Sequence, residues 1–167
     1  KKSIAIDTTT DEGRALLREL AETADVFLTN VRPGGLARSG LDYDGLKSAN
    51  PKLVYCSLTG YGLDGPDADK PGFWARSGVA RATIPKGSEP FPCRTAFGDH
   101  TTSIAAAAGI CAALVEAGRT GKGRLVEASL LRTALFTMGS DFAIQLFFGR
   151  LGSTKQRHEQ TVPIMNF

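Results

Sequence analysis

The acidic residue Asp99 stands at the beginning of an alanine-rich apolar segment, GDHTTSIAAAAGICAAL, over residues 98–114. The segment predicts a helix, and aspartate often caps a helix amino terminus, so spacing alone favours a capping role for Asp99. The second interpretation is chemical. A carboxylate at this position faces unpaired N–H groups, which could stabilise the oxyanion formed when it attacks a carbonyl group. Gly98 would let a ligand approach the backbone closely.

Polar residues also follow an apolar run at residues 25–30 that predicts a buried strand. Asn30 ends this strand, which is where ligands bind in open parallel sheets. Arg32 and Arg38 flank a Pro-Gly turn and are either solvated side chains or a clamp for phosphate groups. Spacing alone favours the solvated side chains. The glycine-rich stretches TGYGLDGP and GRTGKG lack the context of a nucleotide-binding loop and predict turns.

Composition places the chain among ordinary globular proteins. Its 167 residues are 42% hydrophobic with a net charge of +3, which suits one domain, and the scattered basic residues do not predict nucleic-acid binding. Three cysteines and two histidines have no zinc-site spacing, so we expect no metal, and the odd cysteine count favours a cytoplasmic location. Cys56 and Cys111 lie in apolar runs and are expected to be buried. The apolar stretch Ile104–Val115 is too short to span a membrane.

The predicted elements alternate between strands and helices. Thr9 and Glu12 have the spacing of a capping box for the first helix. The residues between 61 and 98 form a turn-rich and proline-rich excursion of the kind that is often functional. Alternation of this type predicts a parallel sheet. The expected strands are residues 3–7, 25–30, 52–60 and 124–130, and the expected helices are residues 9–24, 42–50, 99–117 and 130–149.

Two long stretches together resemble the family III coenzyme A transferases, the group typified by formyl-CoA and carnitine CoA-transferases. The first is DVFLTNVRPGGLARSGLDYDGLKSANPKLVYCSLTGYGLDGP, and the second is FGDHTTSIAAAAGICAALVEAGRTGKGRLVEASLL. Members typically show an Asn-Phe-Arg-Pro-Gly motif, an NPRLVY-like strand, a Gly-Asp pair before a helix and an RTGRGQ-like turn. The matches run in order from residue 2 to about residue 149.

The resemblance implies an α/β fold with a Rossmann-like parallel sheet flanked by helices. Residues 1–150 would form the large domain, lacking its first strand and helix, and residues 151–167 would be a linker towards a missing small domain. It also implies a homodimer whose two chains are interlocked like links. We therefore expect this chain to be a fragment that is inactive alone.

The resemblance also assigns roles to residues. Asp99 falls on the family nucleophile, which attacks an acyl-CoA thioester and later carries coenzyme A as an aspartyl thioester. Acyl-CoA and a carboxylic acid are the substrates, and no permanently bound cofactor is needed. The implied coenzyme A contacts are Ile6, Asp7, Thr8, Thr9, Asn30, Val31, Arg32, Arg38 and Phe73.

Two departures from the family pattern affect this assignment. Val31 replaces the usual aromatic residue. PGFWARSG runs on where members have an acidic residue and several more, so Phe73 marks either a true deletion or residues missing from the chain.

Two alternatives stay open. An α-methylacyl-CoA racemase of the same family would use a histidine where this chain has Phe73. A non-catalytic acyl-CoA-binding relative would be expected to lack the acidic residue, which Asp99 supplies.

Overall fold

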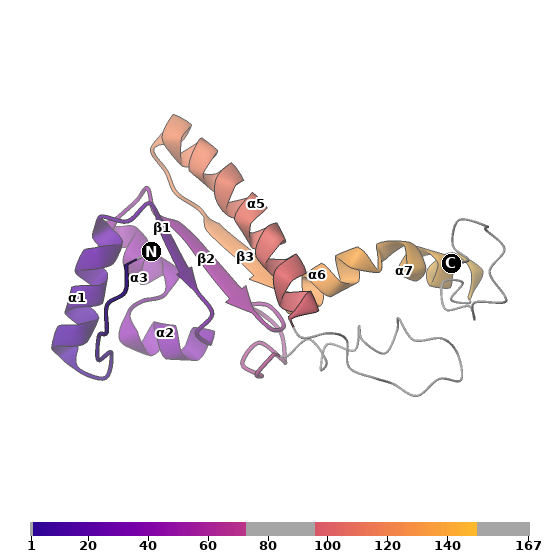
Figure 1. Cartoon of the computed structure of the whole chain (residues 1–167), viewed down its shortest axis with the longest axis horizontal. Helices are drawn as coiled ribbons and strands as arrows, with labels where there is room; N and C mark the ends of the chain where they lie inside the picture. Colours follow the sequence, from indigo (N-terminus) through magenta and orange to yellow (C-terminus); the bar gives the residue numbers. More distant parts are fainter. Residues whose placement is uncertain (1, 73–95, 150–167) are drawn as a thin grey trace.

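The computed structural model describes residues 2–72 and 96–149, which form an α/β unit around a parallel sheet. The sheet order is β1–β2–β3, with β1 at Val26–Thr29, β2 at Val54–Thr59 and β3 at Leu125–Ser129 (Figure 1). Both pairings are parallel, with Val26 opposite Val54 and Tyr55 opposite Leu125. The predicted α/β class, with a parallel sheet flanked by helices, is confirmed.

One helix precedes β1, and two shorter helices form the crossover from β1 to β2. They are α1 at Asp11–Glu22, α2 at Pro33–Ser39 and α3 at Tyr43–Ala49. Ala21 of α1, Leu36 of α2 and Leu46 of α3 belong to a buried cluster with Tyr55 of β2. Alternate residues of a strand face opposite sides of a sheet, so the helices that pack on Tyr55 all lie on the same face.

The long helix α5, Phe97–Thr120, covers the other face of the sheet (Figure 1). Cys56, the residue after Tyr55, is fully buried in a cluster with Ala106 of α5 and Ala128 of β3. β2 is therefore covered on both faces, which explains why its sequence is mostly apolar and carries no charged residue. Small residues on α5 allow close packing: a Cβ on Gly109 would lie 2.8 Å from Val126 Cγ1.

Within the described ranges, α5 is the one helix long and apolar enough to cross a membrane. The apolar stretch noted in the sequence, Ile104–Val115, is about half as long as α5. In this structure α5 packs against β2 and β3 and begins with Asp99 in its first turn. The side of α5 that faces β2 and β3 is covered by the sheet, whereas Ile104 and Val115 are exposed.

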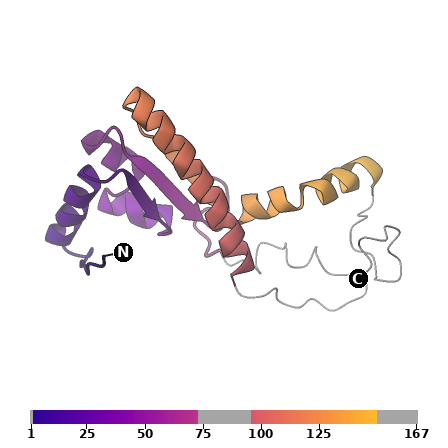
Figure 2. The ribbon, with the colours of Figure 1, turned by 45° about the horizontal axis from the view of Figure 1, so that its top comes forward.

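The carboxyl-terminal apolar segment forms two helices instead of the expected one. α6 spans Leu130–Thr137, α7 spans Gly139–Phe148, and Met138 separates them. Ser129 ends β3 and caps α6 by accepting a hydrogen bond from the Arg132 N–H at 3.2 Å. α7 projects away from the sheet and has no buried residue (Figure 2).

Three further predictions are wrong. Residues 3–7 form no strand, because they pair with none of the described strands and are mostly exposed. The cap of α1 is Thr10, whose hydroxyl accepts from the Gly13 N–H at 3.0 Å, so Thr9 and Glu12 form no capping box. Cys111 is exposed, since it lies on the side of α5 away from the sheet, whereas Cys56 is buried as expected.

Candidate functional site

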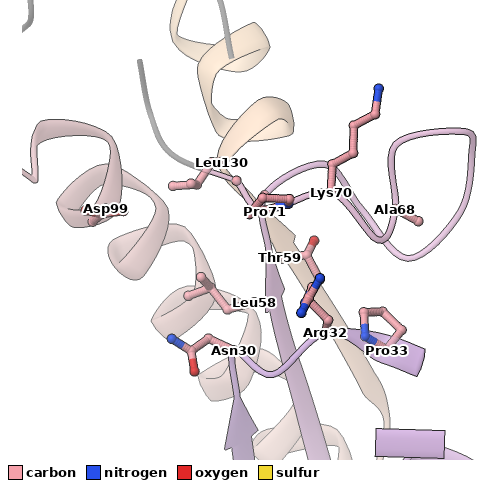
Figure 3. Close-up of a pocket in the computed structure, with 12 residues that line it drawn as sticks. Asn30, Arg32, Pro33, Leu58, Thr59, Ala68, Lys70, Pro71, Asp99 and Leu130 are labelled. Atoms are coloured by element: carbon pink, nitrogen blue, oxygen red, sulfur yellow. The ribbon is translucent and has the colours of Figure 1, made fainter. Parts of the chain in front are cut away.

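A cavity of about 490 Å³ lies at the carboxyl ends of the strands, and Asp99 is part of its wall. Asn30 follows β1, Thr59 ends β2 and Gly60 follows it, and Leu130 follows β3. Parallel strands bring their carboxyl ends to one edge of the sheet, so residues far apart in sequence meet there. The full lining comprises Asn30, Arg32, Pro33, Leu58, Thr59, Gly60, Ala68, Lys70, Pro71, Gly72, Asp99 and Leu130 (Figure 3).

Asp99 lies in the first turn of α5 and is not its cap. The cap position belongs to Ala96, whose left-handed backbone (φ 63°) starts the helix without a side-chain hydrogen bond. The capping interpretation of Asp99 is therefore wrong. The exposed carboxylate sits where the helix dipole and free N–H groups favour negative charge, and it borders the cavity.

The segment after β1 supplies two further predicted residues to this wall, Asn30 and Arg32. Arg32 is the residue before Pro33, the first residue of α2, so the Pro-Gly sequence predicted to be a turn begins a short helix instead. Proline is favoured at this position because its missing N–H would have no partner. Figure 3 shows Asn30 and Arg32 on the chain between β1 and α2.

Arg38 and Val31 do not line the cavity, although both lie at the same end of the sheet. The Arg38 Nη1 and the Asp69 Oδ1 each lie 3.6 Å from the point where a Cβ on Gly34 would be. Arg38 is thus close to the loop that carries Lys70. The Val31 side chain is half exposed and lies beside Gly35 of α2.

The predicted contacts at the amino terminus form a separate turn that leads into α1. Asp7 accepts hydrogen bonds from the Thr9 hydroxyl at 2.6 Å and the Thr9 N–H at 2.9 Å, and these bonds lower the pKa of Asp7. Thr8 is exposed, and Ile6 is half-buried. None of the four borders the cavity, and Phe73 lies outside the described residues, as do residues 151–167.

Lys70, which lies on the loop after β2 and borders the cavity, is a residue that sequence reasoning does not single out. Its ammonium group pairs with Asp67 at 2.5 Å, and this bond raises the pKa of Lys70. The loop is part of the turn-rich excursion between residues 61 and 98, which the sequence predicts to be functional. No local pattern distinguishes Lys70 from other lysines. Across the described ranges, no three His, Cys, Asp or Glu residues come close enough together to hold a metal ion.

Comparison with known proteins identifies the protein family of this chain. The chain matches CoA-transferase family III over residues 1–167. It belongs to this family, which confirms the resemblance.

Individual relatives agree with the family. The chain is 41% identical over 145 residues to (R)-2-hydroxy-4-methylpentanoate CoA-transferase of Clostridioides difficile, covering 84% of this chain and 36% of that protein. It is 39% identical to succinate–glutarate CoA-transferase of Agrobacterium fabrum, covering 90% and 38%. A CAIB/BAIF family protein from Brucella suis superposes with a TM-score of 0.87 at 34% identity, covering 98% and 44%. The chain therefore spans less than half the length of these relatives.

Proposed function

We propose that the protein transfers coenzyme A between an acyl-CoA thioester and a carboxylic acid, with Asp99 as the nucleophile. The observation that carries the proposal is the position of Asp99. Its carboxylate belongs to the first turn of α5 and borders the cavity at the carboxyl ends of the strands, together with Asn30 and Arg32. Membership of CoA-transferase family III supports the same reaction.

In the proposed chemistry the Asp99 carboxylate attacks the thioester carbonyl and expels the coenzyme A thiolate, which leaves a mixed anhydride. The thiolate then attacks the aspartyl carbonyl, giving an aspartyl-CoA thioester and releasing the first carboxylate. An acceptor carboxylate reverses both steps and leaves as the new thioester. Each step exchanges one acyl bond for another, so Asp99 ends the cycle as a free carboxylate.

Positive side chains surround this end of the sheet and suit the phosphates of coenzyme A. Arg32 and Lys70 border the cavity, and Arg38 lies beside the loop that carries Lys70. Arginine binds phosphate oxygens with a planar set of donors, which favours Arg32 and Arg38 for direct contacts. Contacts of Ile6, Asp7, Thr8 and Thr9 with the adenosine end remain part of the proposal.

Mass spectrometry after addition of an acyl-CoA tests the nucleophile directly. Hydroxylamine traps an aspartyl thioester or anhydride as a hydroxamate, which we expect on the peptide that contains Asp99. The protein should be expressed from its complete coding sequence. Asp99→Asn should give no adduct. Asp25→Asn serves as the matched control, because Asp25 precedes β1 at the opposite end of the sheet. Turnover of acyl-CoA without an Asp99 adduct would refute this mechanism.

The same preparation separates transfer from racemisation. The relatives from Clostridioides difficile and Agrobacterium fabrum compared above are named CoA-transferases, which favours transfer. In heavy water we expect coenzyme A to move to an added acid without exchange at the α-carbon. Exchange without transfer would support the racemase alternative, and binding of acyl-CoA with neither reaction would support the non-catalytic one.

The interlocked homodimer and the cytoplasmic location belong to this proposal as well. α7 has no buried residue, and Phe136, Leu146 and Phe147 are each more than four-fifths exposed. A second chain packing on α6 and α7 would remove this apolar surface from water. Light scattering should then give the mass of a dimer, and a monomer at micromolar concentration would refute the assembly. Cell fractionation tests the location.

A further inference from the structure

Glu127 of β3 connects three segments of the chain through one carboxylate. Its Oε1 accepts a hydrogen bond from the Leu63 N–H at 3.0 Å, across 64 residues of sequence. Its Oε2 pairs with Arg132 Nη1 of α6 at 3.2 Å. The Glu127 side chain is only 19% exposed. A charged group is costly to enclose unless it is paired, so these two contacts explain why a glutamate is tolerated here.

The Leu63 end of this connection belongs to a closed loop, residues 60–72. The two ends of the loop touch at glycines: a Cβ on Gly60 would lie 2.3 Å from the Gly72 Cα, and a Cβ on Gly72 would lie 2.1 Å from the Gly60 Cα. The Gly62 N–H donates to the Thr59 hydroxyl at 2.9 Å. The base of the loop is therefore fixed at the end of β2.

The far side of the same loop forms part of the Asp99 cavity. Ala68, Lys70 and Pro71 all border it (Figure 3). Within the loop, the Lys70 N–H donates to the Asp67 carbonyl at 2.9 Å, which holds the cavity side of the loop together. The position of this wall thus depends on how the loop is held against the sheet. At the base of the loop the Gly60 carbonyl accepts from the Leu131 N–H of α6 at 3.0 Å. Among the described residues, Glu127 provides the hydrogen bond between the body of the loop and β3.

We propose that Glu127 is a positioning residue for the substrate site. It holds the loop of residues 60–72 against β3 and so sets the wall that Lys70 and Pro71 contribute to the Asp99 cavity. Glu127 does not border that cavity and is not assigned a chemical step. This inference rests on the proposed function only where it concerns coenzyme A. The effect on the loop itself stands on geometry alone.

Two variants of equal side-chain length separate the hydrogen bond from mere packing. Glu127→Gln keeps an oxygen that can accept from the Leu63 N–H, whereas Glu127→Met keeps the length and removes the acceptor. Arg132→Met is the third variant, because it removes the ion pair and leaves the carboxylate bonded to Leu63. All three are made in the protein expressed from its complete coding sequence.

Amide hydrogen exchange of peptides covering residues 61–72 is the first measurement, and it needs no activity. We expect exchange there to accelerate about threefold to tenfold in Glu127→Met, the factor that corresponds to one net hydrogen bond. Glu127→Gln and Arg132→Met should change it by less than twofold. Equal exchange in Glu127→Met and the unaltered protein would overturn the proposal, as would equal acceleration in all three variants.

Steady-state kinetics is the second measurement. Glu127→Met should raise KM for acyl-CoA by about threefold to tenfold and leave kcat within about twofold, because Asp99 is untouched. A general loss of folded protein would instead lower kcat at constant KM, and this result would overturn the positioning role. Absence of coenzyme A transfer in the unaltered protein would refute the proposed function, whereas the exchange result would still decide whether Glu127 holds the loop.

Discussion

Tyr55 offers the sharpest test of how the helices beside the site are held on the sheet. It is 3% exposed, and its hydroxyl donates to the Leu41 carbonyl at 3.0 Å, just beyond α2. The Phe27 ring stacks on it with centroids 5.2 Å apart. Tyr55→Phe keeps the ring and removes the hydrogen bond, so the free energy of unfolding should fall by about 1 kcal/mol at pH 7.

The same phenol predicts how stability changes at alkaline pH. Burial, with a smaller effect from the charge of Asp42, raises the pKa of Tyr55 from 10.0 to about 12. Folding thus favours the protonated phenol, so this contribution is complete below pH 10 and is lost as the pH rises to 12. The full loss is about 2.7 kcal/mol, and about half of it has occurred by pH 11.

These two magnitudes together predict a crossing of two stability curves. The unaltered protein should be more stable than Tyr55→Phe at pH 7, and the two should become equal between pH 10 and pH 11, where the loss reaches about 1 kcal/mol. Urea unfolding followed by circular dichroism at pH 7, 9, 10 and 11 measures both curves. Tyr43→Phe is the matched control, since its half-buried ring packs edge-on against Tyr55 and the Tyr55 phenol remains. A difference between Tyr55→Phe and the unaltered protein that is zero at pH 7, or independent of pH, would refute the reasoning.

Single contacts give four further predictions. Gly60→Ala and Gly72→Ala should each lower the free energy of unfolding by about 1–3 kcal/mol, because the new Cβ meets backbone; an unchanged urea midpoint would contradict this. Ala96→Gly should raise it by up to about 1 kcal/mol by relieving the left-handed backbone at φ 63°, and a loss would show that Ala96 does not adopt this backbone. Thr102→Val should be neutral or stabilising in the same assay, since the buried hydroxyl has no hydrogen-bond partner among the described residues. Cys56 should resist iodoacetamide until the protein unfolds, because burial covers the thiol and raises its pKa, so rapid labelling of native protein would show that β2 is less covered than described.

A local sequence pattern is enough to predict a helix or strand whose formation depends on its own residues. β2 is predictable because a strand buried on both faces is mostly apolar and uncharged, and α1 because its apolar residues recur at helical spacing. Prediction fails where the outcome depends on a partner. Residues 3–7 have the composition of a strand, yet they pair with no described strand.

The sequence by itself determined the chemistry available at the site. The order of its motifs indicates the family, and residue type and position along the chain are enough to select Asp99, Asn30 and Arg32 as candidates. The structure places all three at one cavity. This agreement has a physical cause: parallel strands carry the residues that follow them to one edge of the sheet, so strand ends can be read from the chain.

Tertiary structure alone decided which other groups join them and what holds them there. Lys70 reaches the cavity only because the chain after β2 turns back on itself where Gly60 and Gly72 touch. Glu127 holds that loop from a point 64 residues away from its partner Leu63. Neither contact leaves a local pattern, because each depends on the order of the strands and the path of a loop through space.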